Sequence, residues 1–404
     1  MKHSPHKPQG PTPEFELACL CCRAEVGEND LASIAALLRR LDVRSFLELV
    51  IERHRIGPLV HAVLARLPAR DLPAGLMPSL AEVARGNAVR YLGARRAHIL
   101  LARWFDQAGI AWMPLKGLSL AERCYADPAQ RHVNDLDVWV PAADLGRARQ
   151  LLLSRGFCAE PGDGHWRMAQ RGPRHLRFLM DYFHEERLVS ADLGVLELHW
   201  RLTDTPDRFA LGPQDMLTRA SHVGRDGHRL GVLDDTDQLL YLCEHGGRHG
   251  WCRLKWLADL PRLLAQPWDW AQVLARAREL RCERQLLLGC ALCEALFAWA
   301  PDPAVRARLR RAGSLPLLAG LVQQTLQVPI GYHESGARVS LAWLVRDFTR
   351  SLLLSGSPAA LATQVWRRAL SPHDMLACPV PDRWFALYYL LRPLLFMKRR
   401  LRPG

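Results

Sequence analysis

The period of the apolar residues changes twice along the chain, and this change constrains the fold more than any other feature. In residues 14–107, apolar side chains recur at every third or fourth position, the period of helices packed on a core. The same period returns from residue 234 onward, interrupted by prolines. Short strand and helix patterns alternate between these segments. The sequence therefore predicts an α+β fold in which a small mixed sheet is flanked by N- and C-terminal helical parts.

The expected elements of the middle segment follow a helix at 81–108, which ends at Gly109, a suitable residue for a left-handed cap. Strands are expected at 110–115, 133–140, 176–183 and 194–202, and helices at 119–125 and 143–155. The expected regions are a disordered arm at 1–13, an N-terminal helical region at 14–108, the sheet-containing core at 109–205 and a C-terminal helical region at 206–404.

The chain is basic, with 54 Lys and Arg against 41 Asp and Glu in 404 residues, a net charge of +13. Almost all of the basic residues are Arg, and they occur in every expected helix rather than along one stripe. This distribution does not favour nucleic acid as the partner, although nucleotides, RNA and lipid headgroups are all compatible with a positive charge.

Eleven cysteines form no repeating framework, which indicates a reduced cytoplasmic protein without a cysteine metal site. The polar, Pro-rich start has no apolar segment of the kind found in signal peptides. The apolar run at 384–391 stops at Arg392 and Pro393, so it predicts a terminal helix packed on the bundle and no transmembrane span. The alternative is that this helix and the basic tail at 398–402 lie on an anionic membrane surface.

The strongest chemical signal is the segment 134–140, Asn-Asp-Leu-Asp-Val-Trp-Val. The two-residue period of a strand places Asp135 and Asp137 on one face and Leu136 and Val138 on the other. Two carboxylates side by side repel each other unless a cation or another partner offsets the cost. Mg²⁺ is the natural candidate because it prefers carboxylate and phosphate oxygens. A pair of strand-end aspartates that caps the next helix is the alternative.

An expected strand-to-helix turn upstream of these aspartates contains Lys116, Gly117 and Ser119. Glycine lets the backbone approach a phosphate closely, a helix N-terminus offers free amides, and Lys116 or Ser119 adds a donor. Taken alone, the turn is equally compatible with an ordinary connection. Because Asp135 follows Gly117 by 18 residues, the two motifs together predict a nucleotide site.

The expected strand at 194–202 supplies a third carboxylate. Leu196 and Leu198 share one face, whereas Glu197, His199 and Arg201 share the other. A solvated outer face of an edge strand would have the same pattern. If the strands of Asp137 and Glu197 are neighbours, Asp135, Asp137 and Glu197 converge on one cavity with Lys116 and Gly117 at its edge. Asp192 is the fallback carboxylate.

These motifs resemble the nucleotidyltransferase superfamily of DNA polymerase beta, and most closely a bacterial family of uncharacterised nucleotidyltransferases. The likeness spans roughly residues 15–300 and is carried by Leu115-Lys116-Gly117, Tyr125, Arg131, the 134–137 segment, Gly156-Phe157, the 197–202 segment, His245, the 249–251 segment, the 253–256 segment, Asp259 and the 54–59 segment.

The resemblance implies a Mg²⁺-dependent nucleotidyltransferase that moves a nucleoside monophosphate from an NTP, its co-substrate, to an acceptor hydroxyl. The acceptor would be a small molecule, sugar, peptide or protein. Asp135, Asp137 and Glu197 would be the catalytic metal ligands, and the nucleotide would be bound by Lys116, Gly117, Ser119, Arg131 and His199.

Several of these residues have a second reading. Arg131 could equally be a solvated charge, and His199 a buried structural histidine. His245 and His249 lie four residues apart on an expected helix, where they would contact nucleotide or acceptor rather than a metal. Asp259 is expected to pair with a nearby Arg. The rival function is a non-catalytic module that binds nucleotide or RNA, or an antitoxin-like partner protein.

Overall fold

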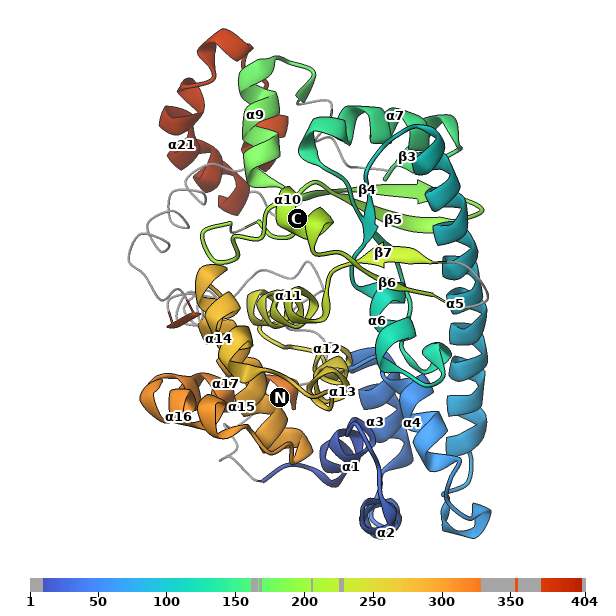
Figure 1. Cartoon of the computed structure of the whole chain (residues 1–404). Coiled ribbons are helices and arrows are strands. Elements are labelled where there is room, and N and C mark those ends of the chain that lie inside the picture. Colours follow the sequence, from blue (N-terminus) through green and yellow to red (C-terminus); the bar gives the residue numbers. More distant parts are fainter. Residues whose placement is uncertain are drawn as a thin grey trace.

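The computed structural model describes residues 10–160, 166, 169–204, 206–224, 229–327, 353–354 and 372–401. Of the arm expected at 1–13, residues 1–9 lie outside this description, and the first helix begins at Pro13. The expected α+β architecture is confirmed, because helices surround a mixed five-stranded sheet and a small two-stranded sheet (Figure 1).

The main sheet has the strand order β1-β2-β5-β4-β3. Its strands are β1 (Met113–Pro114), β2 (Leu136–Trp139), β5 (Gly194–His199), β4 (Glu185–Ser190) and β3 (Cys158–Ala159). The β2–β5 pair is parallel and the other three pairs are antiparallel. The second sheet is a hairpin of β6 (Ser221–Val223) and β7 (Leu230–Val232). Strands were therefore correctly expected near 110–115, 133–140 and 194–202.

The N-terminal part is helical, as expected. Its elements are α1 (Pro13–Cys21), α2 (Glu28–Leu38), α3 (Val43–Leu47), the π-helix η1 (Glu48–Arg53), α4 (Gly57–Leu64), the short η2 (Ala69–Asp71) and α5 (Leu76–Gln107). With 32 residues, α5 is about 48 Å long and runs along one side of the molecule (Figure 1). It ends before Gly109, whose φ of 60° is the left-handed conformation that the sequence predicted.

The helices of the middle segment are α6 (Gly117–Cys124), η3 (Pro128–Gln130), η4 (Ala142–Asp144), α7 (Leu145–Ser154) and α9 (Pro173–Tyr182). The strand expected at 176–183 is wrong, because this stretch belongs to α9. Gly172 and Pro173 start the helix, and His175 and Leu179, four residues apart, are its buried side chains. The strand that pairs with β5 on the side opposite β2 is β4, which the sequence analysis did not predict.

The sequence analysis expected a helical region at 206–404 and did not predict the hairpin of β6 and β7 within it. The other regular elements described in this part are helices. They are α10 (Pro213–Thr218), α11 (Asp235–Arg248), α12 (Leu254–Leu257), α13 (Asp259–Leu264), α14 (Trp270–Glu279), α15 (Glu283–Phe297), α16 (Pro303–Arg311), α17 (Leu315–Leu326), α20 (Pro372–Ala377), η5 (Asp382–Trp384) and α21 (Leu387–Leu401).

Two hydrophobic cores hold these elements. The larger core joins α1–α4 to α11–α17, so helices from the two ends of the sequence pack together. The smaller core contains the sheet, α7 and α9. Helix α5 contributes to both, through Leu76 and Leu80 at its start and through Leu101 and Phe105 near its end. The apolar core therefore does not divide at residue 108, where the N-terminal helical region was expected to end.

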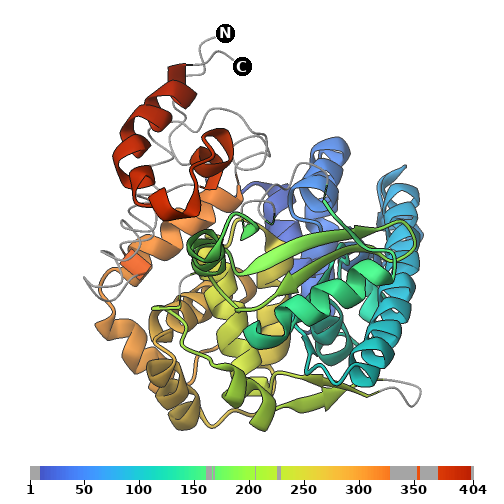
Figure 2. The ribbon, with the colours of Figure 1, turned by 90° about the horizontal axis from the view of Figure 1, so that it is seen from above.

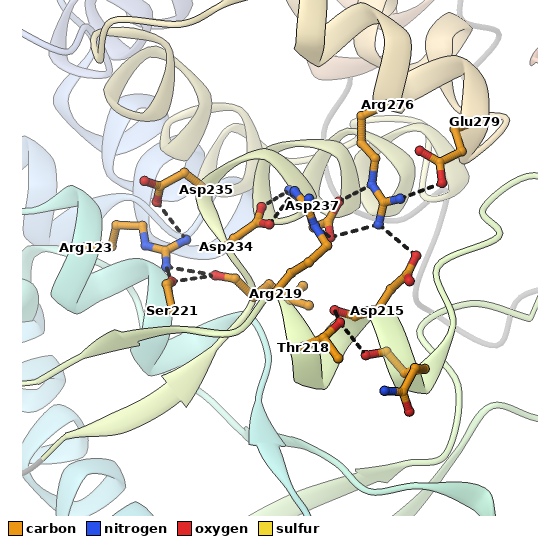
Figure 3. Close-up of polar contacts among 12 residues, drawn as sticks. Arg123, Asp215, Thr218, Arg219, Ser221, Asp234, Asp235, Asp237, Arg276 and Glu279 are labelled. Carbon is orange, nitrogen blue, oxygen red and sulfur yellow. Dashed lines mark hydrogen bonds and ion pairs between the residues drawn. The ribbon is translucent and has the colours of Figure 1, made fainter.

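A network of ion pairs ties the C-terminal helices to the middle segment (Figure 3). Asp237 at the start of α11 is buried and contacts Arg276 of α14 and Arg219. Arg123 of α6 forms an ion pair with Asp235 and donates to a carbonyl group after β7. These contacts fix α11, which provides part of the wall of the cavity described below.

The terminal helix α21 packs beside α9, at the edge of the molecule seen from above in Figure 2. Tyr388 is buried against His175, whereas Leu390 and Leu394 are exposed. None of the helices in the described part of the chain combines the length and apolar character needed to cross a membrane. Contact of α21 with a membrane surface stays a prediction.

Candidate active site

The parallel pairing of β2 and β5 sets two acidic side chains next to each other. In the register of these strands Asp137 is opposite Glu197, and Trp139 is opposite His199. The alternate residues Leu136, Val138, Leu196 and Leu198 are buried in the smaller core. Because side chains alternate along a strand, the apolar residues fix the register and turn both carboxylates to the other face.

This face borders a cavity of about 250 Å³. Asp135, Asp137, Glu197, Lys116 and Gly117 all line it, the arrangement that the strand periodicity predicts. The remaining wall comes from residues 131–134, just before the aspartates, and from three regions distant in sequence: the 53–57 turn, the start of β4, and the segment that contains α11 and α12.

Lys116 and His199 both contact the carboxylate of Asp137. The Lys116 ammonium nitrogen is 3.0 Å from Asp137 Oδ1, and His199 Nε2 is 3.3 Å from the same oxygen. Burial opposes the charged form of Asp137, but Lys116 and then His199 lower the pKa of its carboxyl well below the ordinary value. Burial likewise opposes the charge on Lys116, and Asp137 raises the pKa of its ammonium group. Asp137 is thus an ionised carboxylate at neutral pH.

The other two carboxylates of the cavity behave in opposite ways. Burial, reinforced by the negative charges of Asp137 and Glu185, raises the pKa of Glu197 to about 9. Glu185 is also desolvated, but the contact between its Oε2 and His199 Nδ1, 3.2 Å apart, lowers its pKa below the ordinary value. These pKa shifts favour the protonated form of Glu197 and the charged forms of Asp137 and Glu185 at neutral pH.

Two groups of side chains in this region could hold a metal ion, and both include His199. Donor atoms of Asp137, Glu197 and His199 lie within 4.8 Å of one another, and the same holds for His184, Glu185 and His199. Asp135, expected as a ligand, lines the cavity but is not part of either group. Two carboxylates and one imidazole suit a divalent cation, Mg²⁺ through the oxygens and Mn²⁺ through the full set.

We expect binding of Mg²⁺ or Mn²⁺ to release a proton from Glu197. A proton and a cation compete for this carboxylate, so apparent metal affinity should rise about tenfold per pH unit below pH 9 and level off above it. Calorimetric titration in two buffers of different ionisation enthalpy measures the released proton directly. In Glu197→Gln the proton release should disappear. Affinity that does not change between pH 6 and 8 would contradict this prediction.

The turn before α6 has the geometry that the sequence suggested, except at Ser119. Gly117 has a φ of 42°, the left-handed conformation that favours glycine, whereas a Cβ there would make only an ordinary contact, 3.8 Å from Asp137 Oδ2. Ser119 is buried, does not line the cavity, and donates its hydroxyl to the Leu115 carbonyl group. Its hydroxyl is therefore turned into the helix, away from the position expected for a phosphate donor.

Arg131 lines the cavity, but protein groups engage its guanidinium. It forms a buried ion pair with Asp259, Nε to Oδ1 at 3.0 Å and Nη2 to Oδ2 at 3.0 Å, which confirms the expected pairing of Asp259 with an Arg. Its Nη1 donates to the Gly117 carbonyl at 3.1 Å. Arg131 thus fixes the turn. Asn87 of α5 fixes the segment that leads into β2 by donating to the Arg131 carbonyl at 2.8 Å.

His199 is fully buried between the carboxylates and does not line the cavity itself. His245 of α11 and His249, the residue after its end, do line it, with ring centroids 4.5 Å apart, and the Trp256 ring lies 5.2 Å from that of His249. No metal-binding group among the described residues includes either histidine. The sequence analysis assigned no role to His184, Glu185 or Arg55, which also line the cavity.

Comparison with known families gives one result that bears on this cavity. A family model described as "Uncharacterised nucleotidyltransferase" matches residues 39–298. The match covers more than half of the chain and contains the whole sheet and every residue that lines the cavity. No curated protein matches the sequence.

Proposed function

Because the chain belongs to the family of uncharacterised nucleotidyltransferases, we propose that it is a Mg²⁺-dependent enzyme that moves a nucleoside monophosphate from an NTP to an acceptor hydroxyl. The observation that carries this proposal is the pairing of Asp137 with Glu197 on adjacent parallel strands, beside Lys116 and in one cavity. The proposal includes likeness to the DNA polymerase beta superfamily and a location in the bacterial cytoplasm.

In the proposed reaction the acceptor oxygen forms a bond to the α-phosphorus and loses its proton. The bond from the α-phosphorus to the oxygen shared with the β-phosphorus breaks, and pyrophosphate leaves. Asp137 and Glu197, with Asp135 or His199, would hold a divalent cation, which would supply positive charge to the phosphate oxygens and lower the pKa of the acceptor hydroxyl. The acceptor would be a small molecule, sugar, peptide or protein.

The residues of the chain have separate tasks in this proposal. Lys116 neutralises phosphate charge, and Gly117 lets the backbone approach the nucleotide. His199, which contacts Asp137 and Glu185 and is buried, positions the carboxylates rather than touching the substrate. Arg131 positions the Gly117 turn.

The experiment that tests this function is release of labelled pyrophosphate from each NTP, with a panel of hydroxyl-bearing acceptors and with Mg²⁺ or Mn²⁺. We expect release that depends on the cation, accompanied by a gain of one nucleoside monophosphate in the mass of the acceptor. The double variant Asp135→Ala/Asp137→Ala should be inactive. Metal-independent NTP binding without turnover would favour the non-catalytic module, and equal activity of the double variant would exclude these aspartates from the mechanism.

A further inference from the structure

The cavity contains positive charges that the mechanism above does not use. Six Lys and Arg side chains line it, and four of them bind carboxylates or carbonyl groups of the protein, namely Lys116, Arg131, Arg248 and Arg253. The other two are Arg55 and Lys255. Within the described part of the chain, neither forms a hydrogen bond or an ion pair, although both are only partly exposed.

The fold brings these two cations together from positions 200 residues apart. Arg253 Nη1 donates to the carbonyl groups of Glu52 and Arg53 at 3.0 and 2.8 Å, and the Leu254 amide donates to His54 Nδ1 at 3.2 Å. These contacts join the end of η1 to the start of α12. Arg55 and Lys255, each one residue beyond a residue of this junction, line both the main cavity and the small hollow beside it.

The pKa values of Lys255 and His132 indicate a positive electrostatic potential around these two cations. Burial, together with the positive charges of Arg131 and Arg55, lowers the pKa of Lys255 to about 8, although Asp135 opposes this shift. Burial together with Lys255 lowers the pKa of His132 to about 3. Positive charges gathered in one cavity repel one another and attract an anion.

We propose that Arg55 and Lys255 form the subsite for the β- and γ-phosphates of the NTP and, after transfer, for the leaving pyrophosphate. This inference rests on the proposed function and names the residues that would bind the terminal phosphates of the NTP. The carboxylates come from β2 and β5, whereas Arg55 and Lys255 come from the 53–57 turn and α12, and both sets line the same cavity. Arg131, the phosphate ligand expected from the sequence, is committed to Asp259 and leaves this role to the pair.

The chemistry of the two side chains suits a polyphosphate tail. A guanidinium offers parallel donors to two phosphate oxygens, and an ammonium group supplies a compact charge. The terminal phosphates of an NTP carry most of its negative charge, and the divalent cation neutralises only part of it. Arg55 and Lys255, which form no ion pair or hydrogen bond within the described residues, complete the balance; Lys255 contacts only the face of the Trp256 ring, at 5.7 Å.

Binding of inorganic tripolyphosphate, measured by calorimetry in the presence of Mg²⁺, tests the subsite without requiring an acceptor or turnover. The variants are Lys255→Met and Arg55→Asn, since asparagine tolerates the left-handed backbone of Arg55 (φ 54°). We expect each to weaken tripolyphosphate binding by about 10- to 100-fold. Lys255→Arg should retain most of the affinity, and nucleoside monophosphate binding should not change in any variant.

The matched control is Arg70→Asn, which removes an exposed charge outside the cavity and should leave binding unchanged. Thermal melting shows whether each variant is folded, and Lys255→Arg tests the site even if Lys255→Met is not. Tripolyphosphate affinity that is the same in wild type, Lys255→Met and Arg55→Asn would overturn the subsite. If wild type binds tripolyphosphate through these residues yet transfers no nucleotide, the subsite stands and the proposed function fails.

Discussion

Replacing Asp137 with Asn should lower the rate of nucleotidyl transfer by about 10³-fold or more, because a metal ion at such a site supplies several kcal/mol of stabilisation to the transition state. Asp137 contacts Lys116 and His199 and belongs to one of the groups that could hold the proposed cation. Asparagine keeps its size and one oxygen that can accept from Lys116, so the variant should fold. Single-turnover release of pyrophosphate measures the loss, and circular dichroism verifies the fold.

Asp192→Asn is the matched control for this prediction. It makes the same chemical change at the fallback carboxylate of the sequence analysis, which is exposed in the turn between β4 and β5 and does not line the cavity. Transfer by this variant should equal that of wild type. If Asp137→Asn keeps more than a tenth of the wild-type rate, or if Asp192→Asn loses as much, the assignment of the cation to β2 and β5 is wrong.

The β2–β5 half of the cavity was predictable from the sequence because local periodicity determines it. Leu136 and Val138 alternate with the aspartates, and Leu196 and Leu198 alternate with Glu197, so burying the apolar sets turns the acids to the other face. The helical parts were predictable for the same reason. The sequence did not determine whether the two strands are neighbours. The structure pairs them directly, with Asp137 opposite Glu197.

Alternation misled the prediction where two periods coincide. Residues 176–183 contain Leu176, Phe178 and Met180 at every second position, which is typical of a strand, yet Leu179 and His175 form the buried face of a helix. In β4 the buried side chain of Glu186 hid the pattern, because a charged residue at an inward position is unusual unless it is paired. Its partner, Arg149, comes from α7, 37 residues away.

The remaining parts of the cavity depend on long-range contacts that carry no local signal. Arg55 and Lys255 belong to segments that resemble the family, but only the junction between η1 and α12 brings them to one place. Arg131 was expected to contact phosphate. Its actual partner, Asp259, is 128 residues away, so no local pattern around Arg131 indicated the ion pair. In both cases the residue types were visible in the sequence, and their roles were not.

Replacing Asp259 with Ala should destabilise the protein by about 3–5 kcal/mol, the usual cost of removing one partner from a buried ion pair. Asp259 is fully buried and accepts from Arg131 and from the Tyr125 hydroxyl at 2.8 Å. The variant removes the acceptor of the Tyr125 hydroxyl and of the Nε and Nη2 groups of Arg131, whose Nη1 keeps only the Gly117 carbonyl. Urea unfolding of wild type and variant measures the difference in the free energy of unfolding. A loss below about 1 kcal/mol would show that water replaces the carboxylate.

The double variant Arg131→Met/Asp259→Leu separates the cost of an unpaired charge from the worth of the pair. Replacing both partners with apolar residues of similar size should restore most of the stability lost in Asp259→Ala, because no buried charge remains. Transfer activity should not return, since Arg131 Nη1 also donates to the Gly117 carbonyl and fixes the turn beside Asp137. Recovery of stability without activity would identify Arg131 as a positioning residue of the site. Recovery of both would mean that the turn holds its shape without the guanidinium, and no recovery of stability would mean that the pair contributes more than the removal of an unpaired charge explains.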